Sequence, residues 1–237
     1  MLRVRAAGLV CCAALMLATG CATQFASEPP AGVSLAGHWK IDHAASDDPQ
    51  KILAEMRAQA LKIMSRRQGA ASAAPPPSRG GGQRTAGGAD SVPPEDLAPP
   101  PPGPGGRPPD PLRRSPMAHV ILQAIGRGDF LTIREGPGEF VLDYGTSVRR
   151  FTAGVHSVVS AEGGVGDQVS GWQGHAYVIQ IRPQQGPEVT EKYSRAADGR
   201  RLIETLHIAS DELSAVTLTR VYVPTSETAP RELPSND

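Results

Sequence analysis

Beyond residue 21 the sequence contains no cysteine, because all three cysteines lie in the N-terminal stretch, at Cys11, Cys12 and Cys21. The remaining chain can therefore form no disulfide and cannot use a thiol as a nucleophile or a metal ligand. Long apolar runs are also lacking. The longest, residues 6–17, is shorter than the ~20 apolar residues that a membrane-spanning helix needs. We expect a fold that is held together by its own apolar core.

Charge of one sign is not in excess either. The chain has 24 basic and 24 acidic residues, and removing Arg3 and Arg5 with the first 20 residues leaves 22 − 24 = −2. A chain without a basic surplus is not expected to bind nucleic acid. The sequence has no G-x-S-x-G motif and no paired-histidine zinc motif, and no Lys-Ser or Lys-Thr pair follows the glycines of residues 163–166. We therefore expect no enzyme activity, no cofactor and no metal.

The first 20 residues have the features of a signal peptide, with two arginines followed by a short apolar core. The sequence Leu17-Ala18-Thr19-Gly20-Cys21 resembles the lipobox of bacterial lipoproteins. The resemblance implies cleavage before Cys21 and attachment of lipid (a diacylglycerol and commonly palmitate) to that cysteine. Ala22, in place of an aspartate, implies the outer membrane, with the protein facing the periplasm. An ordinary secretory signal cut near Ala22 is the alternative.

Composition divides the rest of the chain into four parts. Residues 21–34 are small and polar and predict a tether. Residues 35–68 and 117–224 together predict a single β-rich domain of ordinary size. Between them, residues 69–116 hold 14 of the 23 prolines and 9 of the 26 glycines, which predicts a disordered Pro/Gly-rich insert. Residues 225–237 predict a polar tail.

Two segments show the spacing of amphipathic helices. In the first, Asp48 can cap the N-terminus, Pro49 suits the first turn, and Gly69 can end the helix. Its apolar stripe recurs every three or four residues between positions 52 and 64. In the second, Ser115 is the expected cap and Gly126 the expected end. We expect both helices to pack on the domain core.

After residue 126 the apolar period changes to two, which is typical of strands. Turn residues such as Gly163-Gly164 and Asp198-Gly199 separate the segments, so neighbours are expected to pair as antiparallel hairpins. Strands are expected at 35–42, 130–134, 139–143, 147–151, 155–160, 167–172, 176–182, 188–195, 201–208 and 215–223. The fold class is mainly β: an antiparallel meander of about nine or ten strands, closed as a barrel or a sandwich, with two short helices.

The segment Gly37-His38-Trp39 resembles the G-x-W motif that begins lipocalins and related calycin barrels. The later Arg220-Val221-Tyr222 together with this start also resembles uncharacterised proteobacterial lipoproteins, which imply no activity. The lipocalin resemblance implies a tryptophan at the barrel bottom with a late arginine stacked on it. We therefore expect Arg220 to stack on Trp39.

Several side chains are candidates for a ligand cavity. The candidates are Trp39, Trp172, Tyr177, Tyr193 and Arg220. Core packing is the commoner role for isolated aromatic residues, and Trp172, flanked by Gly171, is the one most open to ligand contact.

Two acids, Glu191 and Glu204, share faces with aliphatic residues on adjacent predicted strands. If both pointed inward, their proximity would raise the pKa of one of them and would suggest acid–base chemistry. The favoured interpretation is that both lie outside, paired with Lys192, Arg195 or Arg201.

The sequence therefore predicts a non-enzymatic cell-envelope lipoprotein whose membrane contact is the lipid on Cys21. Its domain would bind a small apolar ligand or an envelope protein. The alternative is a structural or assembly lipoprotein that reaches other envelope components through its proline-rich segment.

Overall fold

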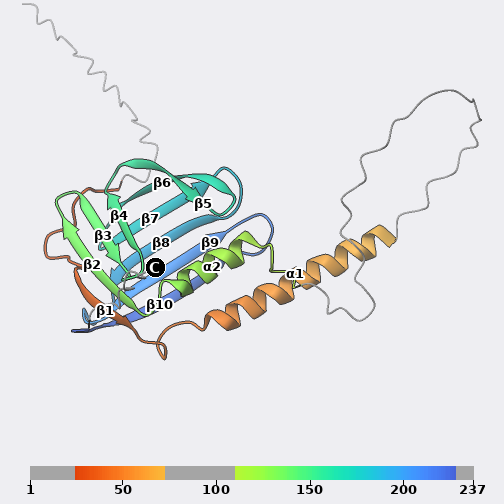
Figure 1. The fold of residues 1–237 in the computed structure, drawn as a ribbon, viewed down its shortest axis with the longest axis horizontal. Coiled ribbons are helices and arrows are strands. Elements are labelled where there is room, and N and C mark those ends of the chain that lie inside the picture. The colour runs from red at the N-terminus through yellow and green to blue at the C-terminus, as the bar shows by residue number, and fades with distance from the viewer. Residues whose placement is uncertain (1–24, 73–109, 228–237) are drawn as a thin grey trace, which may run out of the picture.

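A computed structural model describes residues 25–72 and 110–227. The predicted signal peptide, the lipobox with Cys21, most of the proline-rich insert and the end of the polar tail lie outside these residues. What the structure describes is the β-rich domain with its two helices (Figure 1).

All ten strands belong to one antiparallel sheet, in the order β4-β3-β2-β1-β10-β9-β8-β7-β6-β5. The strands are β1 (Gly37–Ile41), β2 (Phe130–Gly136), β3 (Glu139–Asp143), β4 (Val148–Thr152), β5 (His156–Ala161), β6 (Gly164–Gln173), β7 (Ala176–Pro183), β8 (Glu188–Arg195), β9 (Leu202–Ala209) and β10 (Val216–Pro224). Neighbouring strands in the sheet are joined as hairpins, except at β1. This strand lies between β2 and β10 and pairs with both. The predicted antiparallel meander is confirmed, and each predicted strand lies within a few residues of an observed one.

The sheet curls on itself, so that β2, β3 and β4 lie over β7, β8 and β9 (Figure 1). Because the strands of residues 25–72 and 110–227 form a single curled sheet, this part of the chain has the architecture of a half-barrel and not of a sandwich. The two terminal strands, β4 and β5, follow each other in the chain, but no pairing joins them among the described residues. They form an open seam along the side of the half-barrel.

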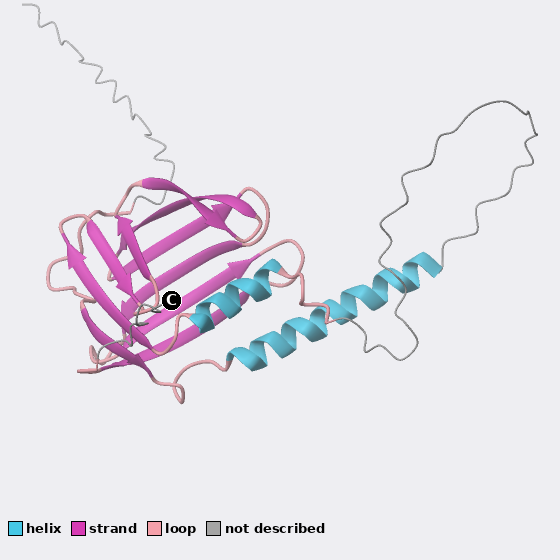
Figure 2. Cartoon of the chain, in the orientation of Figure 1, coloured by secondary structure: helices cyan, strands magenta, loops and turns pink. Residues whose placement is uncertain are grey.

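Both helices lie between β1 and β2 in the chain and on the same side of the sheet (Figure 2). The helix α2 (Pro116–Gly126) begins and ends as predicted, and its cap Ser115 accepts a hydrogen bond from the Ala118 amide at 3.4 Å. The helix α1 (Pro49–Ser72) continues past the predicted stop at Gly69, which is exposed and has open space around its α-carbon. Only the first half of α1 buries side chains, at Leu53 and Met56.

Two apolar clusters fill the inside of the sheet. The first joins the two layers of strands and is rich in aromatic residues, including Phe140, Trp172 and Tyr177. The second lies under the helices and joins aliphatic residues of α1 and α2 to those of β8, β9 and β10. The sheet therefore buries one face over most of its strands, with the edge strand β5 mostly exposed, and this gives the buried strands their alternating apolar pattern.

The predicted tether, residues 21–34, is described from Phe25 onward, and its first described residues pack on the sheet. The side chain of Phe25 is buried, and Ala26 and Trp172 exchange two backbone hydrogen bonds of 2.9 Å. Residues 25 and 26, which we call the N-terminal strap, cover the part of β6 that does not pair with β5. The strap packs there because burying the aromatic side chain of Phe25 removes apolar surface from water, and the favourable free energy exceeds the cost of ordering the polar residues around it.

Candidate functional site

Glu191 on β8 and Glu204 on β9 point into the half-barrel, and their exposed fractions are 1% and 0%. The favoured sequence interpretation, which placed both acids outside, is wrong. The period-two pattern of their strands holds without interruption, and the acids occupy inward positions between the two apolar clusters. A buried carboxylate needs cationic or hydrogen-bonding partners, and the structure supplies both.

Glu191 receives three short hydrogen bonds from three different elements. Arg127, at the C-terminal cap of α2, donates from Nη2 to Oε1 at 2.8 Å. Arg149 on β4 donates from Nη1 to Oε2 at 2.6 Å. The Tyr193 hydroxyl lies 2.9 Å from Oε2, and Tyr144 adds its own hydroxyl at 3.0 Å from that of Tyr193. Glu191 therefore links α2 and the edge strand β4 to β8.

Glu204 is held in a similar way on the neighbouring strand. Tyr222 donates to its Oε2 at 2.7 Å, and Arg127 donates to its Oε1 at 3.3 Å. The guanidinium of Arg220 lies 3.6 Å from Oε2. The two acids thus share Arg127, and among the described residues no buried side-chain nitrogen or oxygen in the protein lacks a hydrogen-bond partner.

Arg220 does not stack on Trp39, and that expectation is wrong. Its guanidinium donates to the carbonyl oxygens of Ala124 and Gly128, at the C-terminal end of α2, at 3.1 and 2.6 Å. The cation over the Trp39 ring is Arg195, at 4.5 Å from the ring centroid. The strand register explains why Arg220 does not reach Trp39. Trp39 pairs with Pro224 at the end of β10, and Arg220 lies closer to the start of that strand.

Burial and charge act in opposite directions on these groups. Burial alone would raise the pKa of Glu191, but the attraction of Arg127 and Arg149 is larger and holds that pKa well below its usual range. Burial raises the pKa of the phenols of Tyr144 and Tyr193. At neutral pH the cluster therefore contains an ionised Glu191 and neutral tyrosines.

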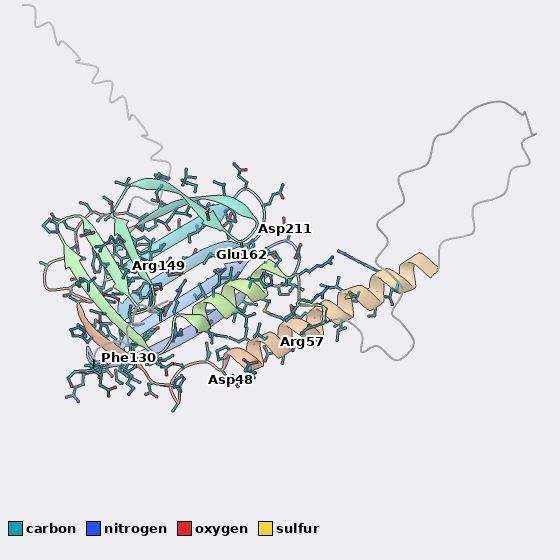
Figure 3. All side chains as sticks on the ribbon, viewed as in Figure 1. Asp48, Arg57, Phe130, Arg149, Glu162 and Asp211 are labelled. Carbon is teal, nitrogen blue, oxygen red and sulfur yellow. The ribbon has the colours of Figure 1, made fainter. Side chains whose placement is uncertain are left out.

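A pocket of about 530 Å³ lies beside this cluster, under α2 and at the seam between β4 and β5. Arg127, Arg149 and Glu191 form its charged end, and the exposed fractions of the two arginine side chains are 16% and 23%. Figure 3 labels Arg149 on β4 and Glu162, which lies on the far side of the seam after β5. The pocket also has an apolar part, which comes from five elements through Val120, Phe151, Val159, Ile181 and Val189, and a polar part that includes Gln123, Arg150, Glu162 and Gln168. Its volume falls within the range of small-molecule sites.

The residues proposed from the sequence lie inside the half-barrel but do not line this pocket. Each is at most 5% exposed, and none contributes to the lining: Trp39, Trp172, Tyr177, Tyr193 and Arg220. Trp172, Tyr177 and Phe140 contact one another, and burial raises the pKa of the Tyr177 phenol to about 12. Their role as direct ligand contacts stays a prediction.

Arg127 and Arg149, the cations of the site, were not predicted from the sequence. Arg127 directly follows the glycine at the end of α2, where a cation usually serves only the helix dipole. The position of Arg149 in the sequence did indicate that it points inward, because it is two residues from Phe151 and so lies on the same face of the strand. That indication is weak in a strand of five residues whose other positions are mostly exposed.

Two features are absent from residues 25–72 and 110–227: a cluster of metal-ligating side chains and a membrane-spanning helix. Within these ranges no three or more histidine, cysteine, aspartate or glutamate side chains gather in a way that could hold a metal ion. No helix there has the length and apolar character to cross a membrane.

No family model matches the chain, and no curated protein matches it in sequence. Among solved structures, Caenorhabditis elegans lipid binding protein 8 is similar at a TM-score of 0.43 and 12% identity, over 82% of this chain and 100% of that one. A structure described as the REP1-NXSQ fatty acid transporter gives 0.40 and 12%, over 82% and 98%. Zebrafish ileal bile acid-binding protein with cholic acid gives 0.32 and 17%, over 45% and 80%.

Proposed function

We propose that this chain is a cell-envelope lipoprotein that binds a small, largely apolar ligand in the pocket under α2. The observation that supports it most is the pocket itself, in which apolar side chains adjoin the charged end formed by Arg127, Arg149 and Glu191. Sites for small molecules commonly have this composition, with a few polar groups that fix the orientation of an otherwise apolar ligand. The apolar part would lie along Phe151, Val159 and Ile181, and the polar end would face Arg127 and Arg149.

The envelope location is part of the same proposal and rests on the sequence. Lipid on Cys21 would anchor the domain, and Ala22 favours the outer membrane, with the domain in the periplasm. More than one acyl chain is needed for firm anchoring, which the lipoprotein type of modification supplies. Labelled palmitate should be incorporated into the wild-type chain and lost in Cys21→Ser, and incorporation that persists in this variant would contradict the anchor.

Filling the pocket should test the binding function. Val159 lies on the edge strand β5 and lines the pocket, whereas its neighbour Val158 is 77% exposed on the outer face. Val159→Trp should weaken binding of a fluorescent amphiphilic probe, the anion 1-anilinonaphthalene-8-sulfonate, by about tenfold or more, because the indole takes the space of the ligand. Val158→Trp adds the same side chain outside the pocket and should bind the probe as the wild type does.

The measurement is a fluorescence titration of residues 21–237 carrying Cys21→Ser, purified without detergent. Mass spectrometry of organic extracts from the same preparations should show a small molecule with the wild type and the Val158 variant only. Equal probe affinity in the two tryptophan variants would show that the pocket is not the site.

A further inference from the structure

The buried ionic cluster beside the pocket has more positive than negative charge. It contains three guanidinium groups, those of Arg127, Arg149 and Arg220, and two carboxyl groups, those of Glu191 and Glu204. At their ordinary charges near pH 7 these groups sum to +1. The tyrosines in contact with them do not alter the sum, because burial raises the pKa of Tyr144, Tyr193 and Tyr222.

The surplus charge lies on the pocket side of the cluster. Arg220 is compensated away from the pocket, since it is close to Glu204 and donates to two carbonyl oxygens at the end of α2. Arg149 pairs with the carboxylate of Glu191. Arg127 pairs with Glu191 at 2.8 Å and also with Glu204 at 3.3 Å, the acid that Arg220 contacts as well. They are also the two arginines of the cluster that line the pocket.

Other charged groups of the pocket lining do not remove this surplus. Arg150 and Glu162 carry opposite charges and cancel in the sum. Arg150 is 64% exposed and pairs with Glu139, whereas Glu162 is 26% exposed and pairs with Gln123 and His119 rather than with Arg127 or Arg149. Groups in contact with water are screened much more strongly than groups in the interior. The charge that a ligand meets at the end of the pocket is therefore set by Arg127, Arg149 and Glu191.

We infer that Glu191 determines ligand specificity, by setting the charge of the pocket so that it takes amphiphiles with one negative charge. The inference rests on the proposed function and adds the charge of the ligand to it. A single anionic group brings the interior to neutrality and can accept hydrogen bonds from both arginines. An uncharged head leaves the surplus in place, and a doubly charged head replaces it with a surplus of the opposite sign, at the cost of burying an uncompensated charge.

A set of dodecyl compounds that differ only in head group tests the inference. The probes are dodecanoate, dodecanol, dodecylamine and dodecyl phosphate, titrated calorimetrically at pH 8 into residues 21–237 carrying Cys21→Ser. At that pH the phosphate monoester carries nearly two negative charges, because its second pKa is about 6. Dodecanoate should bind about tenfold more tightly than each of the other three, a difference of about 1.4 kcal/mol.

Changing the charge of the pocket by one unit should change the preference. Glu191→Gln keeps the size of the side chain and raises the cluster from +1 to +2, so dodecyl phosphate should now bind more tightly than dodecanoate. Glu188→Gln removes one negative charge from the same strand, at an exposed outward position, and should keep the wild-type order. A purely structural role for Glu191 would lower all affinities together without reversing the order.

The outcomes separate the inference from the function on which it rests. Equal binding of dodecanol and dodecanoate, or an unchanged order in a folded Glu191→Gln protein, would overturn the inference and leave the apolar pocket in place. Failure of all four probes to bind would overturn the proposed function as well. If circular dichroism shows that Glu191→Gln does not fold, the order of the four probes on the wild-type pocket decides the inference.

Discussion

The two ends of the half-barrel interior are built in different ways. At one end Phe140 stacks on Tyr177 with ring centroids 3.7 Å apart, Trp172 meets both rings edge-on, and the strap covers β6. At the other end β4 and β5 separate, and a pocket with a charged end takes the place of a packed core. Aromatic side chains fill the first end, whereas the second end is left partly unfilled and contains the pocket. The dense aromatic packing and the pocket thus occupy different parts of one interior, and Phe151 belongs to both.

The largest effect that separates the two ends should come from removing a side chain at each. Phe140→Ala at the packed end should cost about 3–5 kcal/mol of unfolding free energy, because it leaves a cavity among fixed rings. Val159→Ala at the seam should cost less than about 1 kcal/mol, because the side chain already borders a pocket. Denaturant unfolding followed by circular dichroism measures both, and equal losses would contradict the division.

A smaller effect should appear on acidification. A carboxyl group whose pKa is lower in the folded than in the unfolded state stabilises the fold above its unfolded pKa, near 4.3 for glutamate. This contribution is lost as the pH falls toward the folded pKa, and Glu191 is such a group. Between about pH 5 and pH 2 the wild type should lose stability more steeply than Glu191→Gln, by at most about 1.4 kcal/mol per pH unit.

The control for acidification is Glu188→Gln, whose stability curve should run parallel to that of the wild type. Urea unfolding at each pH measures the unfolding free energy. If this free energy fell with pH equally steeply in Glu191→Gln and in the wild type, the ion pairs of Glu191 would not be what stabilises the seam.

The smallest effect should come from the strap at the packed end. A β-carbon on Gly171 would lie 2.6 Å from the β-carbon of Phe25 and 2.9 Å from the Ala26 oxygen, so only glycine allows this approach. Gly171→Ala should displace the strap at a cost of about 1 kcal/mol, with faster amide exchange at Ala26 and Trp172. Gly136→Ala on β2 meets no atom closer than 3.9 Å and should leave that exchange unchanged.

The sequence predicts the strands well because their alternation and turns are local. It fails at the charged site because the partners of Glu191 come from elsewhere in the chain. Lys192, Arg195 and Arg201 are near in sequence and suggested a solvent-exposed pairing, whereas the observed cations come from the end of a helix and from an edge strand. Burial of an acid depends on cations that only the curled sheet brings close, and no local pattern of β8 contains that information.

The pairing of the first strand with the last has a consequence for the order of events during synthesis. β1 obtains its partner β10 only after nearly the whole domain has emerged, and such long-range pairings slow folding. Until then β1 and the helices that follow it have no completed sheet to pack on. If the chain is exported, as proposed, this delay is useful, because a polypeptide that folds late stays able to pass through a membrane channel.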